Sequence, residues 1–394
     1  MSDWLRPRLK FDIGWSHLMS AIFGKATEHS LPERQAGRHW VYGLSVRTLF
    51  DAILSELALP ESTPIVCTGI NISDIRNIIR AHGLEPIAVD IETDTLLPAP
   101  GKLTEACFNS GAKHCLIAHL FGSYSELPDL STLREAGVTV ISDLAQAYDG
   151  PDSLNLERNA DITLFSFGPI KRKTALGGAL AGFLSPEMSK RIERRLESYP
   201  AKSDFWFRRR ALKYLIVKSA THPYCYAFLE AGCGLFGGDF DALIGGSSRG
   251  FGHAGDIQRF RFRPPRRLLA LLSHRIIEPP TGEARTQAVL SVQDQLPVCI
   301  SPVGERAHRH AHWIVPLTSD RNPEHYIVAL REFGFDATRG TTSLRCFAPS
   351  QAPIADEFMK SVFYIPHPVN MSELDRTKLS TRLATISNRA KDKS

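Results

Sequence analysis

The chain has 394 residues, of which 43% are hydrophobic and 23% charged, and its formal net charge is +5. This length can bury a large core and allows two or three domains, and the composition is ordinary for a soluble globular protein. The sequence lacks a run of about 18 apolar residues, which argues against a membrane-spanning helix.

The cysteines, the N-terminus and the charged residues indicate the compartment and the possible partners of the protein. The seven cysteines are scattered without pairing or metal-ligand spacing, which indicates a reducing compartment and no metal site. The N-terminus lacks a secretory signal, so we expect a cytoplasmic protein. Basic clusters at 208–213 and 259–267 usually mark a solvated face, but they can also meet phosphate or an anionic membrane surface. Without a recognised nucleic-acid module, nucleic acid is not an expected partner.

The first element with a clear pattern is a helix over 43–57. Residues 1–40 mix aromatic and basic side chains and are interpreted as an N-terminal arm with a short helix at 17–23. In 43–57, apolar residues recur at helical spacing behind Ser45, a candidate N-cap. The free backbone N–H groups at such a helix start can bind phosphate. An ordinary capped core helix is the alternative.

Strand and helix patterns then alternate along the chain. This alternation predicts an α/β fold in which helices cover both faces of a mostly parallel sheet. The expected strands are 64–69, 85–91, 113–122, 138–143, 162–167 and 179–184. The expected helices are 73–83, 103–111 and 185–200, and 125–137 is expected to be a loop and a helix.

An acid and an amine follow two of these strands. Asp143 ends the strand 138–143, and Lys171 follows the strand 162–167 after a Gly-Pro break. Ligands collect at the carboxyl ends of parallel strands, so we expect both side chains to face one crevice. This pair suits pyridoxal 5'-phosphate, because a lysine can form a Schiff base with its aldehyde and a carboxylate can pair with its pyridine nitrogen. Each residue alone has an ordinary alternative. An Asp at the end of a strand is most often a helix N-cap, and a Lys after Gly-Pro is most often a solvated loop residue.

Three motifs resemble the DegT/StrS sugar aminotransferases, whose pattern is D-x-A-Q-A, then S-F-x-x-x-K, then G-G. The matching residues are Asp143 to Ala147, Ser166 to Lys171, and Gly177-Gly178. Segments 83–96 and 119–122 are also similar to family motifs. Lys173 is a rival amine, and the family spacing favours Lys171.

The resemblance implies a set of cofactor contacts. Asp143 would hold the pyridine nitrogen, Gln146 the ring hydroxyl, and Ser166 the phosphate. In the family a Gly-Thr pair opens the phosphate-binding helix, and Ser45-Val46 followed by Arg47 takes its place here.

Two positions depart from the family pattern. Arg261 replaces the Asn that reaches the phosphate of the neighbouring subunit, and an arginine suits a phosphate by charge. The position of the aromatic residue that stacks on the cofactor ring holds Ile72.

The segment 200–258 is longer than in the compact family plan and mixes aromatic, aliphatic and basic residues. Three interpretations remain open. They are a buried helical hairpin, a lining for a hydrophobic substrate, and an amphipathic patch that makes peripheral membrane contact. Residues 276–394 then predict a small C-terminal α+β domain with helices at 281–296, 323–334 and from 371, and strands near 312–317 and 362–368.

The resemblance implies a fold-type I pyridoxal phosphate transferase: a three-layer α/β/α large domain at 41–275, the small domain at 276–394, and a homodimer with shared active sites. It implies transfer of an amino group from glutamate or glutamine to a keto sugar, commonly nucleotide-linked, with Lys171 as cofactor anchor and general base. The retained Lys171 favours transamination over dehydration. A lipid-like or apolar ketone as acceptor, and a non-catalytic regulator with the same fold, are the alternatives.

Overall fold

The structure, a computed structural model, describes residues 6–8, 10–25, 34–127, 130–220, 257–340 and 342–391. Its centre is an eight-stranded sheet with the order β1-β2-β10-β9-β8-β6-β3-β5. The strands are β1 (Arg34–Gln35), β2 (Arg38–Gly43), β3 (Pro64–Thr68), β5 (Glu85–Val89), β6 (His114–Ala118), β8 (Thr139–Asp143), β9 (Ile162–Ser166) and β10 (Ala179–Phe183).

Five of these strands, from β5 to β9 in the sheet order, run parallel. β10, β2 and β1 then pair antiparallel at one side. The parallel strands are short apolar runs because helices bury both of their faces. The prediction of a mostly parallel α/β sheet is therefore confirmed.

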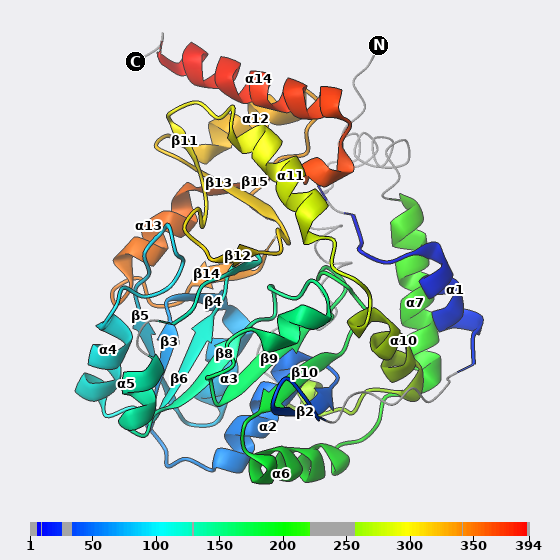
Figure 1. Ribbon diagram of the computed structural model, residues 1–394, viewed down its shortest axis with the longest axis vertical. Helices are drawn as coiled ribbons and strands as arrows, with labels where there is room; N and C mark the ends of the chain where they lie inside the picture. Colours follow the sequence, from blue (N-terminus) through cyan, green and yellow to red (C-terminus); the bar gives the residue numbers. More distant parts are fainter. Residues whose placement is uncertain are drawn as a thin grey trace.

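Helices cover both faces of the sheet (Figure 1). Because side chains alternate along a strand, Ile141 of β8 packs with the helices of one face and Val140 with those of the other. The first face carries α2 (Val46–Leu57), α3 (Ser73–Ala81) and α6 (Pro186–Glu197). The second carries α4 (Lys102–Ser110), α5 (Leu130–Glu135), α1 (Trp15–Phe23), α7 (Asp204–Ala220) and α10 (Arg266–Ile276).

A glycine pair brings the chain back into the sheet after the predicted lysine loop. Gly178 has a φ of 87°, which favours glycine. A Cβ at this position would lie 3.1 Å from side-chain carbons of Leu268 and Leu272 in α10. The missing side chain thus lets α10 approach the start of β10 closely.

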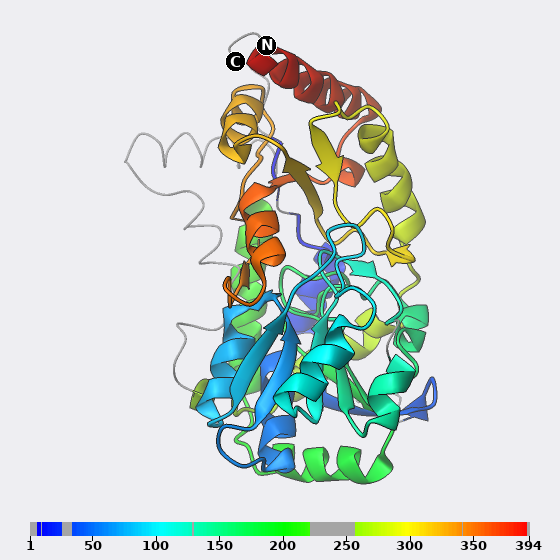
Figure 2. The same cartoon turned by 90° about the vertical axis from the view of Figure 1, so that its left-hand side faces the viewer.

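The C-terminal part forms a separate layer above the large sheet, with α14 (Glu373–Lys391) at the opposite end of the molecule from α6 (Figure 2). Its three-stranded antiparallel sheet has the order β11-β13-β15. The strand predicted near 312–317 begins at Val315, and residues 312 and 313 precede it as a loop. The elements are β11 (Ile300–Pro302), β13 (Val315–Ser319), β15 (Val362–Ile365), α11 (Gly282–Gln293), α12 (Pro323–Glu332), α13 (Pro353–Ser361) and the 3-10 turn Pro368–Asn370.

Two short strand pairs connect this layer to the large sheet. β12 (Arg309–His310) pairs with β7 (Ser123–Tyr124), and β14 (Leu344–Cys346) pairs with β4 (Ile70–Ile72). Ile72 therefore lies at the end of a short strand, with Leu344 opposite it. The 3-10 turns Pro151–Asn155 and Ile257–Phe260 complete the described elements.

Part of the predicted N-terminal arm belongs to the sheet, because β1 and the first half of β2 lie before residue 41. The strand β2 is held by pairing with β10, which the sequence pattern does not reveal. Earlier in the chain, α1 packs beside α7 and α10, and Arg6 forms an ion pair with Asp375 at 2.6 Å. The N-terminal segment thus contacts both layers.

Of the predicted insertion at 200–258, the structure describes α7 at one end, and residues 221–256 lie outside the described residues. In the described part of the chain, no helix combines the length and apolarity that a membrane span requires.

Candidate active site

Asp143 and Lys171 come from neighbouring parallel strands. Asp143 is the last residue of β8, and Lys171 lies five residues beyond the end of β9. Asp143 is buried, and its Oδ1 accepts a hydrogen bond from the N–H of Ala145 at 3.0 Å. The structure therefore brings the predicted acid and amine to the same edge of the sheet.

The two groups shift each other's pKa. Burial lowers the pKa of Lys171 to about 7, an effect that the Asp143 carboxylate opposes and the Arg47 guanidinium reinforces. Burial likewise raises the pKa of Asp143, against the Ala145 N–H and the charges of Lys171 and Arg47. A lysine with such a pKa is partly neutral at pH 7, as a nucleophile or general base must be.

This shift predicts a pH dependence for Lys171 in the cofactor-free protein. Below its pKa the amine is protonated and unreactive, so labelling by an amine-specific reagent should rise through a pH of about 7. Lysines with ordinary values near 10.4 should label only at higher pH. Peptide mass spectrometry of samples labelled from pH 5 to 10 measures this. Reaction of Lys171 only above pH 9 would contradict the expectation.

Trp313 is a site residue that the sequence reasoning missed. The Nζ of Lys171 lies 3.6 Å from the centroid of its ring, a cation–π distance when the amine is protonated. The indole Nε1 donates to the carbonyl of Ile170 at 2.5 Å, which fixes the ring against the lysine loop. Trp313 comes from the loop before β13, 142 positions along the chain from Lys171. Local patterns cannot reveal such a contact.

A buried polar network holds the backbone next to Trp313. The carbonyl of His312 accepts hydrogen bonds from Arg285 Nε at 3.1 Å and from His367 Nε2 at 2.8 Å. Burial, reinforced by the nearby Arg285, lowers the pKa of His312 to about 4, so its imidazole is neutral at pH 7. Three distant segments thus determine where the indole lies.

The rival amine, Lys173, has a structural role. Its side chain is 4% exposed, and its Nζ donates to the carbonyl of Pro279 at 2.7 Å and lies 3.4 Å from Glu278 Oε2. The neighbouring Arg172 forms ion pairs with Asp149 and, at 2.7 Å, with Asp12. These contacts favour Lys171 as the cofactor lysine.

Gln146 and Ser166 lie where their predicted roles require polar groups. The Oε1 of Gln146 accepts from the N–H of Phe121 at 2.6 Å, which orients the amide so that its NH₂ is the donor left for a ligand. Ser166 ends β9 with a half-buried side chain, and its Oγ accepts from the N–H of Gly168 at 3.4 Å. Their cofactor contacts stay predictions.

The start of α2 is capped as the sequence predicts. The Oγ of Ser45 accepts from the N–H of Thr48 at 3.2 Å, so the hydroxyl already has a partner. Val46 is buried and could offer a ligand only its backbone. Arg47 forms an ion pair with Asp74 of α3. A phosphate at this helix start would therefore meet backbone N–H groups and a positive charge.

Arg261 has a partner in its own chain. Its Nε and Nη2 donate to the carboxylate of Asp51 at 3.0 and 3.2 Å. Asp51 lies fully buried in α2 and also accepts from Tyr199 at 3.0 Å and lies 2.9 Å from His82 Nε2. These bonds hold the pKa of Asp51 below its usual value although burial alone would raise it. The contact of Arg261 with a phosphate of the neighbouring subunit stays a prediction.

We expect Asp51→Ala to lower the free energy of unfolding by about 3 kcal/mol or more, because it leaves Arg261 and Tyr199 without their buried partner. In the wild type this stabilisation is complete above pH 3.8 and is lost as the pH falls through the lower folded pKa. Denaturant unfolding measures it. Asp94→Ala is the matched control, since the Asp94–Arg306 pair is exposed and should contribute less than about 1 kcal/mol. If Asp51→Ala and Asp94→Ala lowered the free energy of unfolding equally, the stabilising role of the buried Asp51 would be contradicted.

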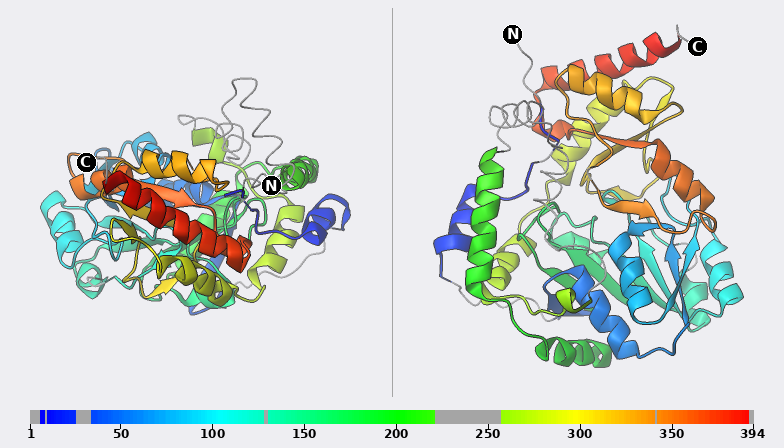
Figure 3. Two further views of the ribbon diagram at one scale, coloured as in Figure 1. Left: turned by 90° about the horizontal axis from the view of Figure 1, so that it is seen from above. Right: turned by 180° about the vertical axis from the view of Figure 1, so that it is seen from behind.

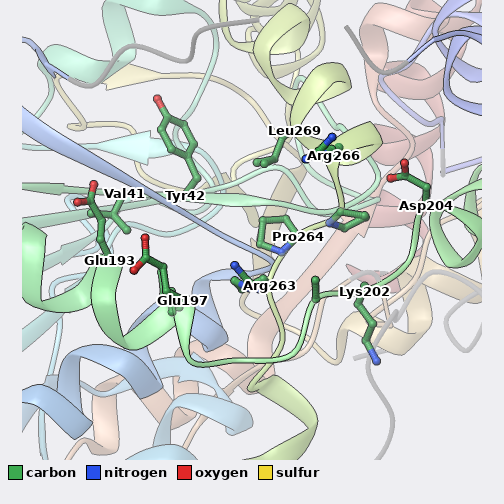
Figure 4. Close-up of a pocket in the computed structure, with 13 residues that line it drawn as sticks. Val41, Tyr42, Glu193, Glu197, Lys202, Asp204, Arg263, Pro264, Arg266 and Leu269 are labelled. Carbon is green, nitrogen blue, oxygen red and sulfur yellow. The ribbon is translucent and has the colours of Figure 1, made fainter. Parts of the chain in front are cut away.

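A cavity among the described residues lies elsewhere (Figure 4). It measures about 730 Å³ and lies between β2, α6 and the segment leading into α10. Its lining mixes Glu193 and Glu197 with Arg263 and Arg266, and it includes none of the predicted site residues. The candidate site is identified instead by the acid and the amine at the ends of β8 and β9.

The donor set around Lys171 fits pyridoxal phosphate. A lysine of lowered pKa, a buried carboxylate, an oriented amide and a helix start with a nearby arginine supply a partner for each polar group of that cofactor.

Comparisons with known proteins agree with this chemistry. Residues 51–208 match the model of the DegT/DnrJ/EryC1/StrS aminotransferase family. A 3-oxo-glucose-6-phosphate:glutamate aminotransferase of Bacillus subtilis is 31% identical over 149 residues, which are 36% of this chain and 33% of that protein. The chain thus matches about a third of the length of this relative.

Solved structures are similar over almost the whole chain. Spr1654 from Streptococcus pneumoniae in its PLP form has a TM-score of 0.68 at 15% identity, with 98% of this chain and 99% of that chain covered. PseC from Helicobacter pylori, an aminotransferase involved in pseudoaminic acid biosynthesis, has a TM-score of 0.65 at 12% identity, with 98% and 99% covered. These likenesses show the fold, which is that of fold-type I pyridoxal phosphate aminotransferases.

Proposed function

We propose that this chain, whose residues 51–208 match the model of the DegT/DnrJ/EryC1/StrS aminotransferase family, is a pyridoxal 5'-phosphate-dependent transaminase of that family. The proposed reaction moves an amino group from glutamate or glutamine to a keto sugar. The observation that carries the proposal is Lys171, an amine of lowered pKa beside the buried carboxylate of Asp143. The relative from Bacillus subtilis, whose name gives a keto sugar phosphate and glutamate, supports this choice of substrates.

In this mechanism pyridoxal phosphate supplies an aldehyde for amine exchange and a ring that withdraws electrons from the substrate carbon. Lys171 would anchor it, and the Nζ, once free, would take the proton from the Cα of the amino donor. Asp143 would stabilise positive charge on the ring nitrogen, and its burial would strengthen that interaction. Gln146, whose Oε1 accepts from the N–H of Phe121, would donate from its NH₂ to the ring hydroxyl.

The phosphate would bind between Ser166 and the backbone at Ser45, Val46 and Arg47. We further propose a homodimer in which Arg261 of the partner subunit reaches this phosphate, and an acceptor sugar that is linked to a nucleotide. Because Arg261 pairs with Asp51 within its own chain, this second role requires the pair to open or to be shared.

The test is a visible absorbance spectrum of purified protein with added pyridoxal phosphate, before and after L-glutamate or L-glutamine. We expect a visible band that one of these donors removes, and its return when a keto sugar acceptor is added. A panel of free, phosphorylated and nucleotide-linked keto sugars, with an apolar ketone as comparison, identifies the acceptor class. No band in the wild-type protein would reject the proposal in favour of a non-catalytic member of the family.

A further inference from the structure

The exposed side of α7 is apolar. Phe205, Leu212 and Ile216 are 67%, 47% and 62% exposed. At 3.6 residues per turn they lie on one side of the helix, opposite the buried residues Phe207 and Tyr214. A helix that only packed on the large sheet would carry polar residues on this outer side.

Basic residues border this apolar stripe. Arg208, Arg209 and Lys213 are exposed on the same side of α7. The sequence of α7 contains five Lys or Arg residues and one acidic residue, Asp204. Asp204 lies at the first turn, where its Oδ1 accepts from the N–H of Arg267 at 3.1 Å. The outer face therefore combines apolar side chains with positive charge.

The neighbouring helix α1 also has exposed apolar side chains. Trp15, Met19 and Phe23 recur every four residues and are 51%, 46% and 73% exposed. Figures 1 and 3 show α1 and α7 side by side along the edge of the molecule.

Two contacts fix the relative direction of these helices. Lys218, near the end of α7, lies 5.4 Å from the ring centroid of Trp15, at the start of α1. At the other end, Arg267 donates to the carbonyl of Gly24 at 2.5 Å and to Asp204. The helices are therefore antiparallel.

We propose that this face, termed the α1–α7 face, binds the surface of an anionic lipid membrane. It consists of Trp15, Met19, Phe23, Phe205, Leu212 and Ile216 with the flanking Arg208, Arg209 and Lys213. Large exposed apolar side chains flanked by arginine and lysine are the pattern of helices that lie in the membrane interface. The positive charges complement anionic head groups, which attract each nearby Lys or Arg.

This attachment is independent of the proposed transamination. It would keep the enzyme at the membrane surface through side chains of two packed helices, without a span. A second copy of this chain is the competing occupant of the face. The basic flank argues against it, because facing copies would bring like charges together.

The experiment is co-sedimentation of the full chain with vesicles of phosphatidylcholine alone and of equal parts phosphatidylserine and phosphatidylcholine. We expect binding to the phosphatidylserine vesicles that weakens at high salt, and little binding to phosphatidylcholine alone. Arg208→Gln/Arg209→Gln/Lys213→Gln should weaken binding on the order of 100-fold. Phe205→Ser/Leu212→Ser/Ile216→Ser should remove it.

The matched control is Val328→Ser/Ile354→Ser, which removes two exposed apolar side chains of the C-terminal layer and should bind as the wild type does. Thermal denaturation verifies that each variant is folded, and light scattering gives its mass in solution. No binding by the wild type, or equal losses in the control, would overturn the proposal. So would an apolar-stripe variant that loses a dimer while vesicle binding is unchanged, which would make the face an interface between copies.

Discussion

Lys171→Ala is expected to remove the visible band of the protein-bound cofactor and to lower the transamination rate by at least about 10²–10⁴-fold, the contribution of a positioned general base. The physical reason is that, among the lysines the structure describes, Lys171 is the one that combines a lowered pKa with a place beside Asp143. The variant should fold as the wild type does. The neighbouring Arg172, with its ion pairs to Asp12 and Asp149, remains in place to hold the loop. Absorbance spectra and steady-state rates with glutamate measure both effects.

Lys173→Met is the matched control. It removes the rival amine two residues away, keeps the aliphatic part of the side chain, and takes away the contacts with Pro279 and Glu278. We expect a lower thermal midpoint but a retained cofactor band. If Lys173→Met lost the band and Lys171→Ala kept it, the cofactor lysine would be Lys173 and the proposed site would be wrong.

Asp143→Asn is expected to reduce the rate about 10²–10³-fold, because it replaces a buried carboxylate by a neutral group at a position where positive charge must be stabilised. The substitution should also have an effect in the cofactor-free protein. The Asp143 charge raises the pKa of Lys171, so its removal should move that pKa below about 7. Catalysis should therefore fall while amine labelling of Lys171 at pH 6 rises.

These two effects of Asp143→Asn have opposite signs, which separates electrostatic loss from misfolding. A misfolded variant would expose Lys171 and return its pKa towards the ordinary value near 10.4. Glu157→Gln offers a control, since Glu157 is another buried carboxyl whose pKa is raised, to about 7, by burial. It should leave the labelling profile of Lys171 unchanged.

Much of the sheet could be predicted from local patterns. The apolar runs before Asp143 and Lys171 are continuous because helices bury both faces of β8 and β9, and such runs are visible in a sequence. The cap at Ser45 was predictable for a similar reason, since its bond to Thr48 spans three residues.

Features that depend on distant segments could not be predicted. The pairing of β2 with β10 joins residues about 140 positions apart, and it places residues 38–40 in the sheet instead of in an arm. Trp313 reaches Lys171 from the other layer. The charge of Asp51 within the apolar pattern of α2 was a visible signal for a buried partner, but the sequence did not identify that partner as Arg261.

The cluster around Arg172 has a consequence for the order of folding. Arg172 binds Asp12, Asp149 and Thr281. Lys171 meets Trp313, and the backbone carbonyl of the preceding residue, His312, is held by His367. Contacts of such sequence separation form late, because long loops must close first. On the ribosome the parallel strands can assemble while the lysine loop is still unfixed. The amine reaches its final place only after nearly the entire chain has emerged.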